Sequence, residues 1–195
     1  MSEDKQSSIS ILNGDITRLD CDIIVNAANR SLLGGGGVDG AIHKAAGKKL
    51  LEECKTLGGC DTGQAKITKG YNLPAKYVIH TVGPVYSGSS EDPILLSNCY
   101  TNSLNLAREY GAKSIAFPAI STGVYGYPLI KAAKVAYDSV SKWISENQDY
   151  VISVKFCCFT SSAYEEYKSL FFKDLCIGIN QIEEENNKKV KNKKC

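Results

Sequence analysis

The sequence predicts a single α/β domain of three layers, in which helices cover both faces of a mixed, mainly parallel β-sheet. Short apolar runs typical of buried strands alternate with longer amphipathic stretches typical of helices, which favours this architecture. Between Lys66 and Val82, two strand-like runs are joined only by a turn through Asn72-Leu73-Pro74, so one strand pair should be antiparallel. With 195 residues, 43% of them hydrophobic, the chain can bury one substantial core.

Six strands are expected from short runs rich in β-branched and other apolar residues. The run Ile23-Ile24-Val25 is continuous rather than alternating, which is typical of a strand buried on both faces. Cys157 and Cys158 are neighbours in the last run, so their side chains should point to opposite faces of the sheet. The expected strands are residues 8–12, 22–26, 66–68, 77–82, 114–117 and 152–159.

Four helices are expected where apolar residues recur at helical spacing. Ile42, Ala46 and Leu50 share one face of the first of these segments. Pro128 suits the first turn of the third, because proline is favoured where a helix begins. The expected helices are residues 41–54, 93–110, 128–146 and 162–173.

The two ends of the chain differ from the domain between them. We expect a short polar segment at 1–8, the domain at 9–178 and a charged, disordered tail at 179–195. Five lysines and three glutamates in 183–195 account for the net charge of +2, so the body is neutral and nucleic acid is not an expected partner. A polar start and no apolar run of membrane-spanning length predict no membrane partner and a cytoplasmic location, with the nucleus as the alternative.

The chain has eight cysteines and two histidines, but no Cys-x-x-Cys pair. We therefore expect reduced thiols, no metal site and no cofactor. His43 lies in the first expected helix and His80 in a strand, and both are interpreted as structural.

A glycine-rich loop links the expected strand 22–26 to the first helix. Residues 34–40 read Gly-Gly-Gly-Gly-Val-Asp-Gly. Because glycine has no Cβ, this loop can bring backbone N–H groups close to a phosphate, and the helix N-terminus behind it adds partial positive charge. Asn29 and Asp39, two side chains capable of chemistry, stand near its two ends.

Two further loops leave expected strand ends. Residues 13–17 (NGDIT) follow the first strand, and residues 118–128 (PAISTGVYGYP) follow the strand at 114–117 and lead into a helix. In α/β sheets, ligands bind beyond the carboxyl ends of the strands. Two loops suited to phosphate at one sheet edge indicate a diphosphate ligand.

Two familiar phosphate-binding patterns fit the glycine loop poorly. Walker A is excluded because no Gly-Lys-Ser/Thr follows the glycines. Residues 35–40 formally satisfy G-x-G-x-x-G, but eight residues separate Val25 from Gly34, whereas a dinucleotide fold needs a tight turn. The acidic residue expected about 20 positions on, Asp61, falls in a loop. A dinucleotide-binding dehydrogenase is therefore disfavoured.

Five segments together resemble the macrodomain family, specifically its MacroD-type branch. They are residues 13–17 (NGDIT), 26–29 (NAAN), 34–40, 76–84 (KYVIHTVGP) and 120–128, and the similarity covers about residues 9–175. The resemblance implies a three-layer α/β/α macrodomain that binds ADP-ribose. It also implies hydrolysis of the ester between ADP-ribose and an acidic side chain, and deacetylation of O-acetyl-ADP-ribose.

The resemblance implies roles for individual residues. Asp15 would accept a hydrogen bond from the adenine amino group, and Phe159 would stack on the adenine. Asn29 would hold the distal ribose hydroxyls, and Asp39 would lie near the anomeric carbon, where a carboxylate can orient or deprotonate a water. The substrate diphosphate is the alternative base. Asn29 and Asp39 are thus the expected catalytic residues, and the other expected substrate-binding residues are Ile16, Asn26, Ala28, Gly35, Gly36, Gly37, Val38, Ser121, Thr122, Gly123, Val124, Tyr125 and Gly126.

Three functions share such a pocket. The first is a monomeric, metal-independent hydrolase that acts on ADP-ribosylated proteins and on O-acetyl-ADP-ribose. The second is a module that reads ADP-ribose without turning it over, and the third is a phosphatase on ADP-ribose 1″-phosphate. A pure reader does not need Asn29 and Asp39 together, so their joint presence favours the hydrolase.

Overall fold

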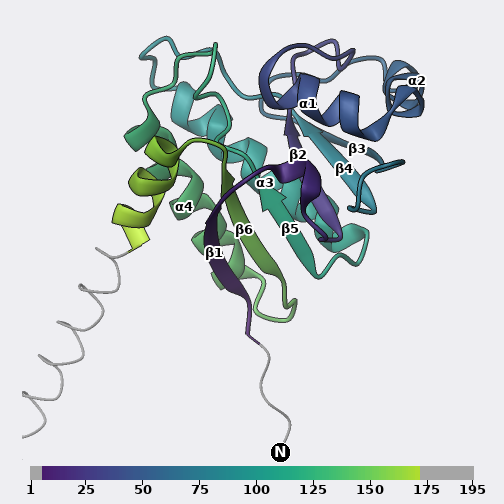
Figure 1. Cartoon of the computed structure of the whole chain (residues 1–195). Coiled ribbons are helices and arrows are strands. Elements are labelled where there is room, and N and C mark those ends of the chain that lie inside the picture. The colour runs from purple at the N-terminus through teal and green to yellow at the C-terminus, as the bar shows by residue number, and fades with distance from the viewer. Residues whose placement is uncertain (1–5, 172–195) are drawn as a thin grey trace, which may run out of the picture.

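A computed structural model describes residues 6–171 and contains a six-stranded sheet between helices (Figure 1). The strands are β1 (Ser8–Asn13), β2 (Ile23–Ala27), β3 (Ala65–Lys69), β4 (Tyr77–Thr81), β5 (Ser114–Phe117) and β6 (Ser153–Cys158). Their order is β1-β6-β5-β2-β4-β3, and each neighbouring pair is parallel except β3 with β4. The predicted three-layer α/β fold with a mixed, mainly parallel sheet is confirmed. The tail expected at 179–195 lies outside the described residues.

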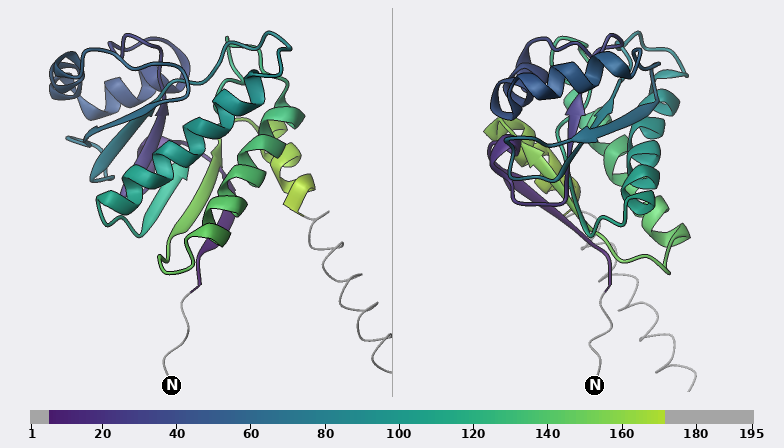
Figure 2. Two further views of the ribbon diagram at one scale, coloured as in Figure 1. Left: turned by 180° about the vertical axis from the view of Figure 1, so that it is seen from behind. Right: turned by 90° about the vertical axis from the view of Figure 1, so that its right-hand side faces the viewer.

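The helices are α1 (Gly37–Ala46), α2 (Lys48–Thr56), α3 (Asp92–Glu109) and α4 (Leu129–Glu146), with a 3₁₀ turn at Ile16–Arg18 and a helical segment at 161–171. Figure 2 shows α3 and α4 side by side on one face of the sheet and α1 with α2 on the other. Ile23 and Val25 pack with α3 and α4, whereas Ile24 packs with α1 and α2. The continuous apolar run of β2 therefore serves two cores, as expected for a strand buried on both faces.

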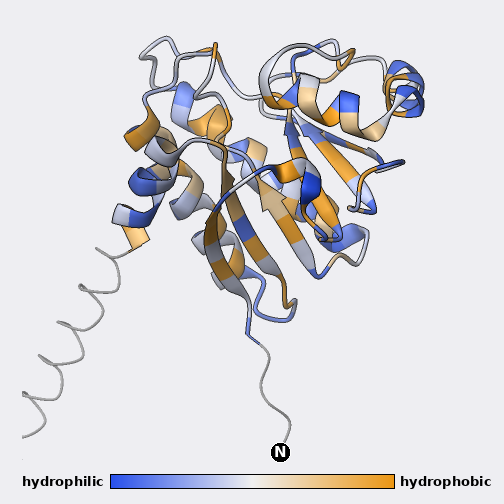
Figure 3. Cartoon of the chain, viewed as in Figure 1, coloured by the Kyte–Doolittle hydropathy of each residue, from blue (hydrophilic) through white to orange (hydrophobic). Residues whose placement is uncertain are grey.

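Hydrophobic residues run along the central strands, while the helices alternate between hydrophobic and hydrophilic residues (Figure 3). Cys157 belongs to the core under α1 and α2 and Cys158 to the core under α3 and α4, which confirms that they point to opposite faces. The six cysteines within 6–171 are all free and buried. In that range, none of the helices has the length and apolarity needed to cross a membrane.

The single helix expected at 41–54 is instead two helices. The first, α1, begins within the glycine loop at Gly37 and ends at Ala46, and α2 begins at Lys48. Gly47 separates them with φ +87°, a backbone conformation that residues other than glycine rarely adopt. The helical spacing of apolar residues continues through the break, so the sequence pattern did not reveal it.

Candidate active site

A cleft of about 890 Å³ opens at the carboxyl end of the sheet. All five parallel strands lead into it: residues 14–16 follow β1, 28–29 follow Ala27 at the end of β2, Gly83 follows β4, 118–125 follow β5, and 159–160 follow β6. The three loops that the sequence singled out thus meet in one cleft.

The predicted site residues line this cleft, except for two. Asn26 was expected to contact substrate, but it is wholly buried behind Asp39. Gly126 lies in a turn where its N–H donates to the carbonyl of Gly123. Sequence reasoning did not assign the remaining lining residues, which are Gly14, Ala27, Ala41, Gly83, Pro118, Ala119, Ile120, Cys157, Thr160 and Ala163. Most of these are small or apolar residues on the predicted loops, and only their shared position at strand ends could have indicated them.

The glycine loop lies close against the start of α1. A Cβ at Gly40 would lie only 2.5 Å from the carbonyl oxygen of Gly35, so the loop can pack here only against a glycine. At Gly36 and Gly37 an added Cβ would meet nothing within 4 Å, so the backbone faces open space there. The first turn of α1, with its unpaired N–H groups, therefore borders the cleft and suits an anion.

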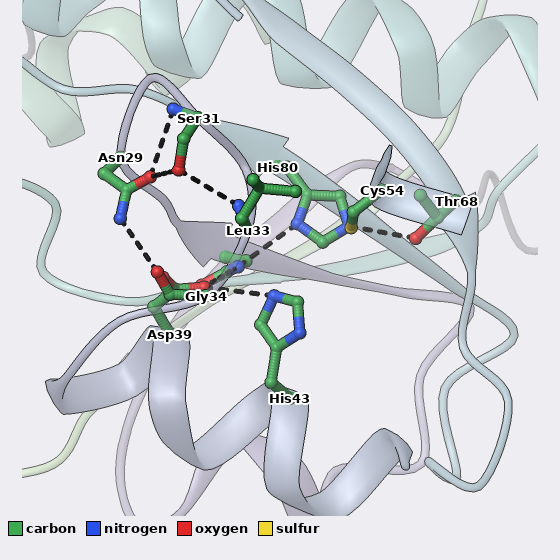
Figure 4. Close-up of polar contacts among 10 residues, drawn as sticks. Asn29, Ser31, Leu33, Gly34, Asp39, His43, Cys54, Thr68 and His80 are labelled. Atoms are coloured by element: carbon green, nitrogen blue, oxygen red, sulfur yellow. Dashed lines mark hydrogen bonds and ion pairs between the residues drawn. The ribbon is translucent and has the colours of Figure 1, made fainter. Parts of the chain in front are cut away.

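Asn29 is held in place by its own loop (Figure 4). Its Nδ2 donates to the carbonyl of Gly34 at 2.9 Å, and its Oδ1 accepts from the backbone N–H and the hydroxyl of Ser31 at 3.1 and 2.6 Å. One N–H of the amide remains for a ligand, because Nδ2 carries two hydrogens. The side chain is thus oriented before any ligand arrives.

Asp39 lies in the first turn of α1 and is 5% exposed. Its Oδ1 accepts a hydrogen bond from Asn26 Nδ2 at 2.7 Å and lies 3.4 Å from His43 Nε2. Its Oδ2 is the oxygen nearer Gly35, on the loop that borders the cleft. His43, interpreted from the sequence as structural, therefore adjoins the expected catalytic carboxylate. The signal that could have indicated this is its spacing, because residues i and i+4 share one face of a helix.

His80 is wholly buried in β4, next to Asn26 on β2. Asn26 Nδ2 lies 3.1 Å from its Nδ1, Thr68 Oγ1 lies 2.9 Å from its Nε2, and Cys54 Sγ lies 3.7 Å from the same Nε2. Burial, with a smaller contribution from the neighbouring His43, lowers the pKa of His80 to about 3, so the ring is neutral.

His80 also belongs to the one group of side chains among the described residues that could hold a metal ion. The donor atoms of His43, Cys54 and His80 lie within 4.8 Å of one another, a proximity that sequence spacing alone did not predict. Burial, with a smaller contribution from the charge of Asp39, raises the pKa of the Cys54 thiol to about 11, so the sulfur carries its proton. A protonated thiol is a poor metal ligand.

The other end of the cleft holds Asp15 and Phe159. Asp15 Oδ1 accepts hydrogen bonds from the backbone N–H and the hydroxyl of Thr17 at 2.9 and 2.7 Å. The Thr17 hydroxyl lowers the pKa of Asp15, so this carboxylate is ionised at neutral pH and can accept further hydrogen bonds. Phe159 is 82% exposed at the end of β6, so its ring is available to a planar group.

The loop after β5 closes the cleft opposite the glycines. Ser121 has φ +65°, and among the described residues its buried hydroxyl has no hydrogen-bond partner. A Cβ at Gly83 would collide with that hydroxyl, so glycine is required beside it. Val124 is fully exposed at the tip of the loop. The loop therefore lines the cleft across from the first turn of α1.

Comparison with known proteins identifies the family. The Macro domain family model matches residues 25–136. The chain is 51% identical to human ADP-ribose glycohydrolase MACROD2, over 91% of this chain and 42% of that protein, and 56% identical to a Macro domain-containing protein of Chlorobaculum tepidum, over 82% and 93%. Among solved structures, the Oceanobacillus iheyensis macrodomain with ADP is 43% identical with a TM-score of 0.81, covering 85% of this chain and 90% of that one. The Trypanosoma brucei macrodomain in complex with ADP-ribose is 46% identical with a TM-score of 0.81, covering 87% and 72%. The chain belongs to the Macro domain family.

Proposed function

We propose that this chain binds ADP-ribose in the cleft and hydrolyses the ester that joins ADP-ribose to Asp or Glu side chains of proteins. The observation that carries the proposal is the placement of Asn29 and Asp39 on either side of Gly35, at the glycine-loop end of the cleft. The chain spans about two fifths of the length of human MACROD2, so the name of that relative supports the activity of this domain alone.

The cleft has a place for each part of ADP-ribose. The diphosphate fits between the first turn of α1 and the loop after β5, where backbone N–H groups can donate to it. The adenine fits at the end that holds Asp15 and Phe159, as an amino group needs an acceptor and a base needs a flat apolar partner. The distal ribose then lies by Asn29 and Asp39.

The chemistry follows from this placement. Asn29 can donate its remaining N–H to a ribose hydroxyl and so fix the sugar. Asp39 can orient a water for attack and accept its proton, because Oδ1 is held by Asn26 while Oδ2 is not engaged by that bond. Attack of the same water on the acetyl carbonyl carbon, with the ribose hydroxyl as leaving group, would release acetate from O-acetyl-ADP-ribose, which we propose as a second substrate of the same site.

Release of label from a modified protein tests this function. A protein modified on glutamate with labelled ADP-ribose is incubated with the chain, and free ADP-ribose is quantified over time alongside calorimetric binding of ADP-ribose. Turnover with free ADP-ribose as product is the expected result. Tight binding with all label retained on the protein would contradict the hydrolase and support a reader module.

A further inference from the structure

A line of buried polar side chains extends behind Asp39, away from the cleft. It passes from Asp39 on α1 to Asn26 on β2, then to His80 on β4 and Thr68 on β3. These four residues are each no more than 5% exposed (Figure 4 shows all but Asn26 labelled). Four elements thus contribute one residue each, and the hydrogen bonds of each side chain limit the orientation of the next one.

The proton positions in this line follow from chemistry. An ionised carboxylate only accepts hydrogen bonds, so the amide atom of Asn26 that faces Asp39 must be nitrogen. The same nitrogen lies 3.1 Å from His80 Nδ1 and has a second N–H to donate, so Nδ1 must be the unprotonated, accepting nitrogen of the neutral ring. The ring proton is then on Nε2 and donates to Thr68 Oγ1, whose own proton donates to the carbonyl of Lys69.

We propose that His80 is a positioning residue for Asp39: its Nδ1 lone pair holds the Asn26 amide in the orientation that directs an N–H at Asp39 Oδ1. This inference rests on the proposed hydrolysis. His80 is wholly buried and does not line the cleft, so a substrate in the cleft would not touch it. Its effect is on the angle and charge of the carboxylate that orients the attacking water.

The arrangement requires an uncharged His80. Protonation of Nδ1 would place its N–H against the N–H of Asn26. The Asn26 amide would then lack the acceptor that keeps its other N–H directed at Asp39. The groups next to the ring are Asn26 from β2, His43 from α1, Cys54 from α2 and Thr68 from β3. Asp39 lies one contact further away, against Asn26 and His43. Full burial and the adjacent His43 keep the ring neutral at the pH of the reaction.

The same assignment argues against a metal at this cluster. Nε2 of His80, the nitrogen nearest Cys54 Sγ, carries the ring proton in this tautomer. A metal would have to displace that proton, and moving it to Nδ1 would break the contact with Asn26.

A pair of substitutions separates positioning from packing. In His80→Asn, the amide oxygen can take the place of Nδ1 and still accept the hydrogen bond from Asn26. In His80→Gln, the longer side chain puts its amide at the place of Nε2, so it keeps the hydrogen bond with Thr68 and loses the one with Asn26. We expect His80→Gln to lower kcat about 10- to 100-fold, because a small misplacement of a reacting group has effects of that size. We expect His80→Asn to retain more kcat than His80→Gln although it leaves the larger cavity, with the Kd for ADP-ribose within about threefold of the parent in both.

A merely structural role would order kcat by stability, with the larger glutamine ahead of asparagine. That order, or parental kcat in His80→Gln, would overturn the proposal. Leu50→Ala is the control for lost stability, since Leu50 is fully buried in the same core without a polar contact to the line. It should lower the melting temperature and leave kcat unchanged.

A measurement on the unaltered protein keeps the test independent of folding in the variants. Nitrogen-15 NMR of the histidine rings should show His80 as the neutral tautomer with its proton on Nε2, unchanged from pH 7.5 to pH 5. A proton on Nδ1, or titration of this ring near pH 6.5, would overturn the proposal. If the parent protein released no ADP-ribose, the proposed function would fail, and the ring tautomer would still decide whether the line is arranged as inferred.

Discussion

At the scale of single residues, Gly35 sets the distance between the two expected catalytic side chains. A Cβ at this position would lie 3.1 Å from Asp39 Oδ2 and 3.3 Å from Asn29 Nδ2. Both distances are shorter than ordinary carbon contacts of about 3.5–4.0 Å, so any side chain would move one of the two polar groups. The absence of a side chain at Gly35 therefore lets Asn29 and Asp39 keep the positions expected for catalysis.

Gly35→Ala tests this role of empty space. We expect kcat to fall about tenfold, because the added methyl group displaces Asn29 or Asp39 by a few tenths of an ångström. The free energy of unfolding should change by less than about 1 kcal/mol, since alanine also restricts the unfolded chain. Steady-state turnover and urea denaturation measure the two effects. A variant with parental kcat would show that the two side chains tolerate this displacement.

Asp39 offers a second test at this scale. Asp39→Ala should lower turnover about 10²- to 10⁴-fold, the usual contribution of a general base, while ADP-ribose still binds. Asp39→Asn can orient a water but cannot accept its proton. Loss of turnover in both variants identifies Asp39 as the base, whereas substantial turnover in Asp39→Asn alone identifies the substrate diphosphate. Turnover at the parental rate in Asp39→Ala would refute a catalytic role.

At the scale of elements, the break between α1 and α2 lets α1 begin inside the glycine loop and aim its N-terminus at the cleft. The break depends on Gly47, where a Cβ would lie 2.8 Å from Asn72 Nδ2 and where φ is +87°. We expect Gly47→Ala to lower the free energy of unfolding by about 1–3 kcal/mol, because this conformation is nearly exclusive to glycine. Chemical denaturation measures that loss. The kcat at a temperature where the variant stays folded should remain parental, and a large fall would show that the break also positions the site.

The sequence predicted those elements whose signal is local and missed features that depend on backbone conformation or strand pairing. Each strand, the antiparallel pair and the glycine loop are local patterns, and the sequence predicted them to within a few residues. The helix break was missed because a glycine in an amphipathic pattern does not reveal its φ. The line from Asp39 to Thr68 was missed because it depends on register: Asn26 lies opposite His80 only once β2 pairs with β4.

At the scale of the whole molecule, a neutral histidine in the core makes stability depend on pH. The pKa of His80 is about 3 in the folded protein and about 6.5 in the unfolded chain, so the unfolded chain binds the proton first as pH falls. The contribution of the neutral His80 ring to the free energy of unfolding is fully present above pH 6.5. It is lost between pH 6.5 and about pH 3, by about 1.4 kcal/mol for each pH unit.

Urea denaturation at pH 7.5, 6.0 and 5.0 should show this decline. In His80→Gln the decline over the same range should be smaller, because carboxylates with a lowered pKa, such as Asp15 and Asp92, lose their stabilising effect only at more acid pH. Equal declines in the parent and His80→Gln would mean that the ring is not buried in its neutral form.

The path of the chain through the domain has a practical consequence. β1 begins at the end of the sheet that is remote from the cleft, and it ends beside the cleft (Figure 1). The helical segment 161–171 begins at the cleft and runs away from it. At its far end, Phe171 packs against Tyr137 in α4. A linker joined at residue 6 would therefore leave on the side opposite the opening of the cleft, and a linker joined at residue 171 would leave from the flank of the domain, directed away from that opening (Figure 1). The domain can be tethered to a sensor surface, a fluorophore or a partner protein by either end while the mouth stays open to a bulky modified protein.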